Sequence, residues 1–364
     1  MRPKDEAELA QVIRVAERPF AIQGGGTRGP RATGDRLDLS GLRGITLYEP
    51  GALTLIARAG TPLAEVEAIL ATEGQRLPFE PPDLRNVLSR DGVSTLGGVA
   101  AANDSGPRRV HSGACRDSLI GVRFVDGRGQ VIRSGGRVMK NVTGLDLVKL
   151  MAGSHGTLGV LTEVAFKLLP APETAASLCL HGQSAGQAVA AMSLALGSAF
   201  EISGAAYVTA RLQTHLRIEG FEASVAYRLG RLTELLGRQG VEISVCQDSA
   251  ALWQSLRDVT PLAGHAGDLW RLSVQPSKAP ALLSRMPEGS NTLLDWGGGR
   301  VWARVPQGID LRAHLGPISG HATLMQIASA LPIFAPETRE VAALSAALRM
   351  KFDPKALFNR GIMG

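Results

Sequence analysis

Three glycine-rich segments in the first half of the chain constrain its fold and function more than any other feature. Residues 24–29 read Gly-Gly-Gly-Thr-Arg-Gly, residues 95–103 read Thr-Leu-Gly-Gly-Val-Ala-Ala-Ala-Asn, and residues 153–160 read Gly-Ser-His-Gly-Thr-Leu-Gly-Val. Glycine lets the backbone approach a ligand closely and lets successive N–H groups converge on an anion, because no Cβ blocks the approach. Any one segment alone is more typical of a tight turn. Together they predict a long, multiply charged ligand held along its length.

The composition narrows the class of protein. A length of 364 residues is enough for two domains, and 45% hydrophobic with 20% charged residues is typical of a globular protein. Aromatic residues make up only 4% of the chain, which disfavours stacking platforms for single-stranded nucleic acid. The formal net charge is +6, and the basic residues are spread along the chain. We therefore expect phosphate ligands inside a diffusely basic protein and no nucleic-acid partner.

Cysteine usage and the absence of a leader predict the compartment. The three cysteines, Cys115, Cys179 and Cys246, form no CxxC pair, which fits a reducing compartment and excludes a cysteine-ligated iron–sulfur cluster on this chain alone. The charged N-terminus has no apolar leader segment. The most apolar span, residues 185–200, is too short to cross a bilayer and is typical of an Ala-rich helix. We expect a cytoplasmic protein.

The pattern of elements predicts an α+β chain that divides near Pro170-Ala171-Pro172. Before this point we predict a helix over 6–16, strands over 19–23, 37–40, 54–60 and 159–168, a hairpin of 120–125 with 131–133, and a helix over 146–151. Beyond it, helices over 185–196 and 231–239 alternate with strands near 205–210, 223–228 and 269–274. A last helix spans 337–350. This alternation of helices and strands in the second half is typical of a small separate domain.

Several motifs occur in an order that resembles a known family. They are the first glycine loop, Pro81-Pro82-Asp83, Thr95-Leu96-Gly97-Gly98 with Asn103, the run from Lys140 to Asp146, Gly156 to Val160, and Phe358-Asn359 near the C-terminus. This series resembles the FAD-binding domain of the vanillyl-alcohol-oxidase (PCMH-type) flavoproteins and covers about half of the chain. The family's terminal motif typically continues with Pro-Gly, whereas Arg360-Gly361 stands here.

The resemblance implies both a fold and a cofactor site. The fold would be a two-subdomain PCMH-type FAD-binding domain over 1–170, a smaller α+β cap over 171–330, and a C-terminal segment, 331–364, that packs back on the first domain. The first loop would bind the FAD pyrophosphate, the second segment the ribityl chain and pyrophosphate, and the third the flavin or adenine. The implied FAD-binding residues are Gly24, Gly25, Gly26, Thr27, Arg28, Gly29, Pro82, Asp83, Thr95, Leu96, Gly97, Gly98, Ala101, Asn103, Arg109, Gly156, Gly159, Val160 and Asn359.

Two departures refine this expectation. Relatives that bind flavin covalently often carry a histidine just after the first glycines, whereas this chain has Thr27-Arg28, so we predict non-covalent FAD. The glycines do not follow the GxGxxG spacing between a strand and a helix, so we do not expect a Rossmann fold.

Within the family, the short length, the small second domain and the segment Gly320 to Leu324 resemble the GlcE-type subunits of bacterial glycolate oxidase. The resemblance implies oxidation of glycolate to glyoxylate, a homologous FAD-binding catalytic subunit, and a separate iron–sulfur subunit that takes the electrons. The complex could lie peripherally at the inner face of the membrane. Two alternatives stay open: a stand-alone 2-hydroxyacid dehydrogenase, and a non-catalytic assembly subunit that keeps the flavin fold.

The sequence does not mark a catalytic set. Arg271, Arg300 and Arg304 are candidates to bind a substrate carboxylate, but no motif distinguishes them. Arg109 and His111 could place positive charge near the phosphates or the flavin, or could equally belong to a solvated loop. His155 stands where relatives often have glutamate, and it could touch the flavin or cap a turn.

Two other histidines could bind a metal, but the sequence favours a structural role for them. His314 and His321 are seven residues apart, as in some relatives that bind a divalent metal, but Pro317-Ile318-Ser319 replaces the expected Asp-Gly-Asn between them. We predict no metal, with His314 at a helix end and His321 at the start of a strand.

Overall fold

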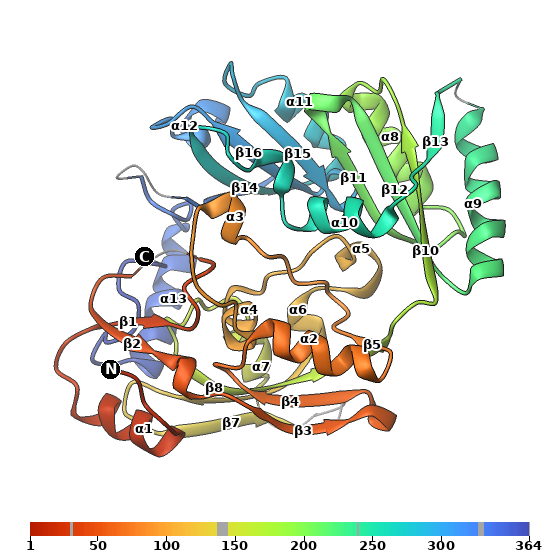
Figure 1. Cartoon of the computed structure of the whole chain (residues 1–364). Coiled ribbons are helices and arrows are strands. Elements are labelled where there is room, and N and C mark those ends of the chain that lie inside the picture. The colour runs from red at the N-terminus through yellow and green to blue at the C-terminus, as the bar shows by residue number, and fades with distance from the viewer. Residues whose placement is uncertain (30–31, 137–144, 239, 327–330, 364) are drawn as a thin grey trace.

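Two large sheets, one in each half of the chain, organise the structure (Figure 1). This computed structural model describes residues 1–29, 32–136, 145–238, 240–326 and 331–363. The first sheet is antiparallel and runs, in spatial order, β3 (Ile45–Glu49), β4 (Thr54–Arg58), β8 (Val160–Lys167), β6 (Leu119–Val125) and β7 (Val131–Gly135). The predicted hairpin of β6 and β7 is confirmed, and the Asp126 carboxylate accepts the backbone N–H groups of Arg128 and Gln130 within its turn.

Helices cover the inner face of this five-stranded sheet and separate it from the second sheet. They are α2 (Leu63–Thr72), α4 (Leu96–Ala102), α6 (Cys115–Ser118) and α7 (Leu147–Met151) (Figure 1). Val66, Val99 and Met151 from these helices pack with Phe124 and Phe166 of the sheet in one buried cluster. Burial of this apolar surface stabilises the layer. It also fixes α4, which carries two of the predicted cofactor glycines, in the middle of the molecule.

A smaller unit flanks the first sheet at the N-terminus. Helix α1 (Glu6–Val15) packs by Leu9 and Ile13 against the parallel pair of β1 (Phe20–Gln23) and β2 (Asp35–Asp38). The end of the chain returns to this unit, because the Phe20 N–H donates to the Leu357 carbonyl and the Asn359 N–H donates to the Phe20 carbonyl. The end of the C-terminal segment therefore contacts the first half of the chain, and the predicted bounds of that segment stay a prediction.

The eight-stranded sheet of the second half is antiparallel. Its order is β13 (Ile243–Val245), β10 (Thr174–Leu180), β12 (Gln213–Gly220), β11 (Ile202–Val208), β15 (Asn291–Asp295), β16 (Arg300–Val305), β14 (Asp268–Val274) and β17 (Gly320–Leu324). Side chains alternate between its faces. One face is apolar and packs on α8 (Ala185–Leu196), α9 (Glu222–Gly237), α11 (Ala279–Leu283) and α12 (Leu311–Leu315).

The other face of this sheet turns toward the first half and carries arginines. Arg217 of β12, Arg271 of β14 and Arg300 of β16 contact carboxylate or carbonyl oxygens of residues 80–105. Helix α10 (Ser249–Arg257) lies on this same side, and its Trp253 and Leu256 belong to one buried cluster with Val87 and Leu88 of α3 (Arg85–Leu88). The two halves therefore meet through a sheet face that combines these arginines with an apolar cluster, in which Val87 and Leu88 are buried with Leu269 and Trp302.

The remaining elements are short, apart from one helix near the C-terminus. They are β5 (Gln75–Arg76), β9 (Leu169–Pro170), α5 (Arg109–Ser112), α13 (Arg339–Phe352), and the 3-10 turns η1 (Leu39–Gly41), η2 (Pro50–Ala52), η3 (Thr209–Arg211), η4 (Thr260–Leu262), η5 (Pro276–Lys278) and η6 (Trp296–Gly298). None of the described helices has both the length and the apolar character needed to cross a membrane.

One predicted strand is wrong. Residues 223–228 form the first part of helix α9 and not a strand, because Val225, Leu232 and Leu236 recur at helical spacing and are buried together on one side. The predicted helix over 231–239 is the second part of the same element. The predicted domain boundaries at 170 and 330 stay predictions, and residue 330 lies outside the described part of the chain.

Candidate functional site

A cleft with an empty volume of about 1120 Å³, partly open to solvent, lies where all three glycine-rich segments meet. It is bounded by β1, the start of α4 and the C-terminal segment around Asn359. The structure thus brings together segments that lie up to about 330 residues apart. Of the predicted FAD-binding residues, the following line the cleft: Gly24, Gly25, Gly26, Thr27, Arg28, Gly29, Thr95, Gly97, Gly98, Ala101, Gly156, Gly159 and Asn359.

Close packing between segments explains several of these glycines. A Cβ on Gly25 would lie 1.5 Å from the Val93 carbonyl oxygen, and a Cβ on Gly97 would lie 2.5 Å from the Ala59 Cβ. Gly26 and Gly156 have φ values of +69° and +72°, which L-residues rarely adopt. The glycines therefore shape the cleft by letting its walls approach one another.

The first glycine loop is the part of the cleft best suited to an anion. Within the described part of the chain, the backbone N–H groups of residues 24–29 donate no hydrogen bond to a protein acceptor. At the start of α4, by contrast, the Gly97 N–H donates to the Ala59 carbonyl at 2.8 Å and the Gly98 N–H to the Thr95 hydroxyl at 3.3 Å. Unpartnered backbone donors on a loop are what phosphate oxygens require.

Asn359 joins two walls of the cleft. Its side-chain oxygen accepts the Ile22 N–H at 2.7 Å, and its side-chain nitrogen donates to the His155 carbonyl at 2.7 Å. Its own φ of +42° is one that asparagine tolerates better than most residues. The terminal Phe-Asn motif therefore ties β1 to the third glycine segment.

Arg28 also lines the cleft, but its guanidinium charge is already paired within the protein. Its guanidinium pairs with Asp104 at 3.2 Å, donates to the Pro82 carbonyl at 3.0 Å and contacts the Ser94 hydroxyl. Arg28 thereby holds the first glycine loop against the second segment. Of the two predicted residues Pro82 and Asp83, Pro82 supplies this carbonyl and Asp83 pairs with Arg85 at 2.7 Å.

The predicted residues outside the lining have other contacts. Asn103 ends α4 with a φ of +50°, and its side chain accepts the Arg116 N–H. The Arg109 guanidinium stacks on Trp296 at 4.3 Å from the ring centre. Leu96 and Val160 are fully buried in the core. Their roles toward FAD stay predictions, and of the resembling run at 140–146 the residues 140–144 lie outside the described part of the chain.

A smaller cavity adjoins the cleft and reaches the second sheet. Gly29, Ala102 and His155 line both spaces, and the smaller one adds Asp104, Arg271, Thr323, Leu324, Met325 and Phe334. Arg271 pairs with Asp104 at 3.1 Å, so this carboxylate is shared between Arg271 and Arg28. Burial and the nearby charge of Arg271 lower the pKa of His155 to about 4, so its imidazole is neutral at pH 7.

The sequence alone could not rank the three candidate carboxylate-binding arginines, but the structure does. Arg304 donates to the Val87 carbonyl at 2.7 Å, and Arg300 donates to the Ser105 carbonyl at 2.6 Å and stacks on Trp296. Both side chains are buried, and their hydrogen bonds link the second half of the chain to the first. Among the three, Arg271 is the one that lines the small cavity. Asp104 was not predicted as a site residue, although it directly follows Asn103 of the second glycine-rich segment and could have been considered for that reason.

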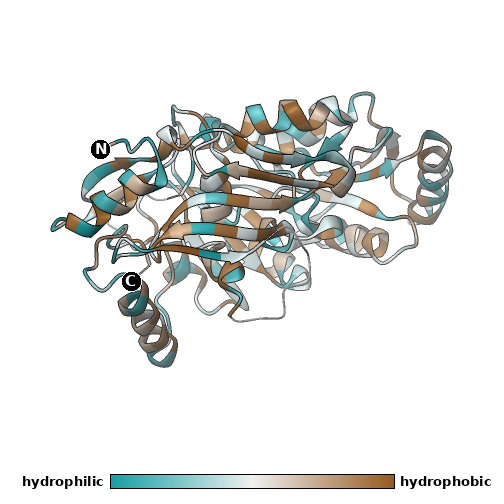
Figure 2. Ribbon diagram, turned by 90° about the horizontal axis from the view of Figure 1, so that it is seen from below, coloured by the Kyte–Doolittle hydropathy of each residue, from teal (hydrophilic) through white to brown (hydrophobic). Residues whose placement is uncertain are grey.

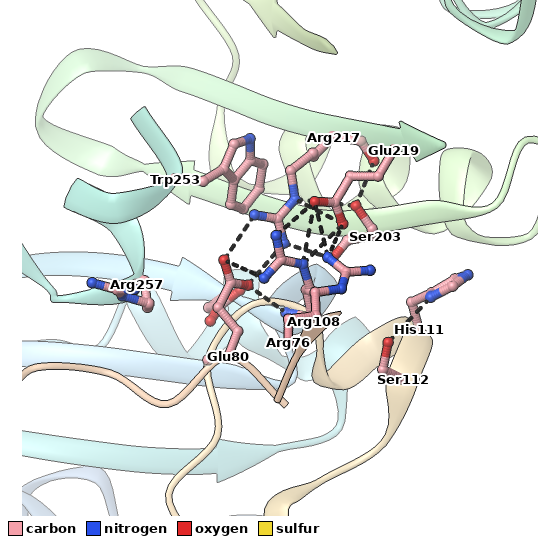
Figure 3. A network of polar contacts seen from close by, with 12 residues as sticks. Arg76, Glu80, Arg108, His111, Ser112, Ser203, Arg217, Glu219, Trp253 and Arg257 are labelled. Carbon is pink, nitrogen blue, oxygen red and sulfur yellow. Dashed lines mark hydrogen bonds and ion pairs between the residues drawn. The ribbon is translucent and has the colours of Figure 1, made fainter. Parts of the chain in front are cut away.

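A second polar network links the halves at another place (Figure 3). Arg217 donates to both oxygens of Glu80 at 3.0 and 2.9 Å, and Arg108 pairs with Glu219 at 2.6 Å. Burial alone would raise the pKa of Glu219, but hydrogen bonds from Arg108 and the charge of Arg217 bring it far below its usual value. Arg76 adds a third cation at 3.3 Å from Glu219.

The two histidines considered for a metal occupy the predicted elements. His314 lies in the last turn of α12, where its Nε2 is 3.0 Å from the Arg285 carbonyl oxygen, and His321 lies at the start of β17. Among the described residues no group of three or more histidine, cysteine or acidic side chains is placed to hold a metal ion.

Comparison with known proteins gives the family. Residues 1–135 match the FAD binding domain family. The chain is 37% identical over 367 residues to glycolate oxidase subunit GlcE of Escherichia coli, and the match covers 98% of this chain and 97% of that protein. The chain belongs to the GlcE family of glycolate oxidase subunits.

Other similarities agree with this family. Glycolate oxidase subunit GlcD of Bacillus subtilis is 33% identical over 48% of this chain but only 38% of its own length. Alkyldihydroxyacetonephosphate synthase superposes with a TM-score of 0.70 at 15% identity, covering 99% of this chain and 76% of its own. p-Cresol methylhydroxylase superposes with a TM-score of 0.65 at 12% identity, covering 86% and 76%. The predicted PCMH-type fold is confirmed.

This GlcE-family chain is therefore an FAD-binding oxidoreductase, as the sequence predicted. The residues of the cleft fit the cofactor, because the described backbone N–H donors of the first loop have no protein acceptor and this loop lines a cleft of about 1120 Å³. The positions at which individual residues would contact FAD belong to the proposal that follows.

Proposed function

We propose that this chain binds FAD non-covalently in the glycine-lined cleft and takes part in the oxidation of glycolate to glyoxylate as one subunit of a glycolate oxidase. The observation that carries this proposal is the continuity of the cleft with the small cavity through Gly29, Ala102 and His155. A cofactor in the cleft would thereby adjoin a space that holds an arginine from the second sheet. When bound, FAD supplies the acceptor for the hydride of the substrate.

The free N–H groups of residues 24–29 are the proposed pyrophosphate site. Gly97, Gly98 and Ala101 bound the middle of the cleft, where the ribityl chain would lie, and Gly156 and Gly159 bound the opposite wall. Thr27-Arg28 supplies no histidine for covalent attachment on the first loop, which supports non-covalent binding. Asn359 supports the site indirectly by holding β1 and His155 in place.

Arg271 is the proposed anchor for the substrate carboxylate. An arginine binds a carboxylate through two parallel N–H···O bonds, and the enclosed surroundings strengthen them. Neutral His155 lines the same cavity and is the proposed acceptor of the hydroxyl proton that glycolate loses as it becomes glyoxylate. Thr323, Met325 and Phe334 bound the remaining space of this cavity, whose empty volume is about 270 Å³.

The described residues offer no site for a second redox centre that could take electrons one at a time. Cys115, Cys179 and Cys246 are free thiols, and the described residues offer no cluster of ligands for a metal centre. We propose that a homologous FAD-binding catalytic subunit and an iron–sulfur subunit complete the enzyme. The E. coli relative is named a subunit, which supports such an assembly. We also propose a cytoplasmic location, with any membrane contact made peripherally through the complex.

The test is an anaerobic glycolate titration of the visible flavin spectrum, made on the chain alone and on the chain co-expressed with both proposed partners. We expect a yellow chain that glycolate does not bleach alone and does bleach in the complex. Bleaching of the isolated chain would instead identify a stand-alone dehydrogenase. A flavin that no preparation reduces with glycolate would overturn the substrate assignment.

Two variants separate the cofactor site from the substrate site. Gly98 lies within α4, and a Cβ there would have the Thr95 hydroxyl at 3.1 Å as its close neighbour, so Gly98→Ala should keep the fold while narrowing the cleft. We expect it to lower flavin content. Arg271→Met should keep the flavin and lose the response to glycolate. Arg231→Met, which removes an exposed arginine of α9, is the matched control and should change neither property.

A further inference from the structure

Helix α13 turns apolar side chains away from the protein. None of its fourteen residues is buried, and Leu344 and Met350 are 68% and 65% exposed. Figure 2 shows this helix beside the C-terminus, projecting from the body of the molecule. A helix that carries so much apolar surface into solvent is typical of a contact surface. The side that lies against the body is formed by the partly exposed residues Ala342, Ser345, Arg349 and Phe352.

Two opposite charges frame the outward side of α13. Glu340 and Lys351 are eleven residues apart, which is close to three helical turns, so both lie on one side of the helix. Leu344 and Ala347 lie between them, so the four positions follow the 4-3-4 spacing of a helix–helix seam. All four residues are exposed. Within the described part of the chain the Glu340 and Lys351 side chains form no ion pair.

We propose that α13 is a self-association surface that pairs antiparallel with α13 of a second copy around a two-fold axis. This arrangement places Glu340 opposite Lys351 of the second copy, and the two-fold axis repeats the pair. It also places the large Leu344 opposite the small Ala347 of the second copy, again twice. A single symmetry operation thus matches both the charges and the volumes of the seam.

The pattern of charge selects a second copy as the occupant. An anionic lipid surface favours an excess of basic groups beside the apolar side chains. On the outward side of α13, however, Glu340 and Lys351 cancel. Arg349 is turned toward the body, where it donates to the Met363 carbonyl. A different partner chain would have to supply its own acid, base and small residue in the order that this helix already carries.

The size of the surface sets the expected strength. A seam of three helical turns on each copy buries less than the roughly 1,200 Å² that stable interfaces need. The dimer should therefore form and dissociate with concentration, with a Kd on the order of micromolar. No residue of the seam lines the cleft or the small cavity. The proposal therefore stands or fails independently of the proposed function.

Sedimentation equilibrium of the full, FAD-saturated chain over a wide concentration range tests this surface. We expect a monomer–dimer equilibrium. Glu340→Lys and Lys351→Glu should each weaken the dimer at least about tenfold, because each change places like charges opposite one another twice. The double variant Glu340→Lys/Lys351→Glu should restore it. Tyr227→Glu changes another exposed side chain, on α9, and should have no effect.

The charge swap makes the result decisive in both directions, because all these residues are exposed and their variants should fold. Thermal unfolding curves that match the wild type confirm this. A chain that is monomeric at every concentration overturns the proposal, and so does a dimer that the single variants leave unchanged. A double variant that stays monomeric also overturns it, because the antiparallel seam requires restoration.

Discussion

The two halves of the chain meet at two charged contacts that use similar residues with different results. At the contact of Figure 3, Arg108 and Arg217 face Glu80 and Glu219, and the neighbouring pocket is lined by arginines and glutamates together. At the other contact, Asp104 is the one carboxylate for both Arg28 and Arg271. The second contact adjoins the glycine-lined cleft, and the first does not.

This difference separates a structural contact from a binding contact. At the first contact, Arg76, Arg108 and Arg217 together pair with both oxygens of Glu80 and of Glu219, and these bidentate contacts hold the two layers together. Where one carboxylate is divided between two cations beside a cavity, an anionic ligand can complete the charge balance. The comparison therefore predicts that changes at the first contact affect stability and that changes at the second affect ligand binding.

The largest expected effect is on stability at the first contact. Arg217→Met leaves Glu80 without its bidentate partner in a buried place, and we expect the free energy of unfolding to fall by about 3–5 kcal/mol. Chemical denaturation measures this. Arg231→Met removes one member of an exposed pair with Glu234 and should cost at most about 1 kcal/mol. Equal effects of the two changes would contradict the structural role of the network.

The next largest effect is expected in the free energy of unfolding when the pH is lowered. Burial, together with neighbouring positive charge, lowers the pKa of His155 and of His215 to about 4 from the ordinary value of 6.5. The unfolded chain takes up these protons first, so stability is present above pH 6.5 and is lost as the pH falls from about 6.5 toward 4. Each histidine contributes up to about 3 kcal/mol to this loss.

Two variants sharpen this result. His155→Gln and His215→Gln should each flatten the decline of stability between about pH 6.5 and pH 4. His155 lines the cleft and His215 lies in the eight-stranded sheet, so we expect only His155→Gln to shift the visible spectrum of the bound flavin. A similar spectral shift with His215→Gln would contradict the proposed position of the cofactor.

A smaller effect is expected when the second contact is changed. Arg271→Met should lower the affinity for glycolate, measured by titrating the change that glycolate causes in the flavin spectrum. We expect a loss of about 10- to 100-fold, the range for loss of hydrogen bonds to a charged group. Arg28 remains beside Asp104, so the melting temperature should change little. Arg271→Lys keeps the charge without the bidentate geometry and should fall between wild type and Arg271→Met. Undiminished glycolate binding by Arg271→Met would remove the second contact as the substrate site.

The smallest effect is expected at His314. Its side chain, in the last turn of α12, contacts the Arg285 carbonyl, and it lines neither the cleft nor the small cavity. His314→Ala should change stability by less than about 0.5 kcal/mol, and chelators should leave glycolate-dependent bleaching of the complex unchanged. Loss of that bleaching after chelation, with its recovery on adding a divalent cation, would show a metal role that the sequence argued against.

The sequence predicted the cleft well and its surroundings poorly, for a physical reason. Each glycine segment is a local feature whose backbone conformation and close approach depend on a few residues, as the φ of Gly26 shows. The pairing of Arg271 with Asp104 joins residues 167 apart and depends on which face of β14 points toward the first half. A single sequence does not state that register, so Arg271, Arg300 and Arg304 could not be told apart.

Two other differences have the same origin. Asn103 and Arg109 follow a cofactor motif in sequence, but the end of α4 turns Asn103 toward Arg116, and Arg109 stacks on Trp296 from the second half. Residues 223–228 contain strand-forming valine and tyrosine, but their apolar positions fit the helical period that buries Val225 with Leu232. In each case the contacts made in the folded chain override what the local sequence predicted.

The most direct test of the central claim, a non-covalently bound FAD in the glycine-lined cleft, is a visible spectrum of the purified chain before and after denaturing precipitation. We expect a yellow protein whose colour passes entirely into the supernatant and is identified there as FAD. A colourless protein purified with a full supply of flavin would contradict the cofactor site of the isolated chain. Colour that stays with the precipitate would contradict non-covalent binding.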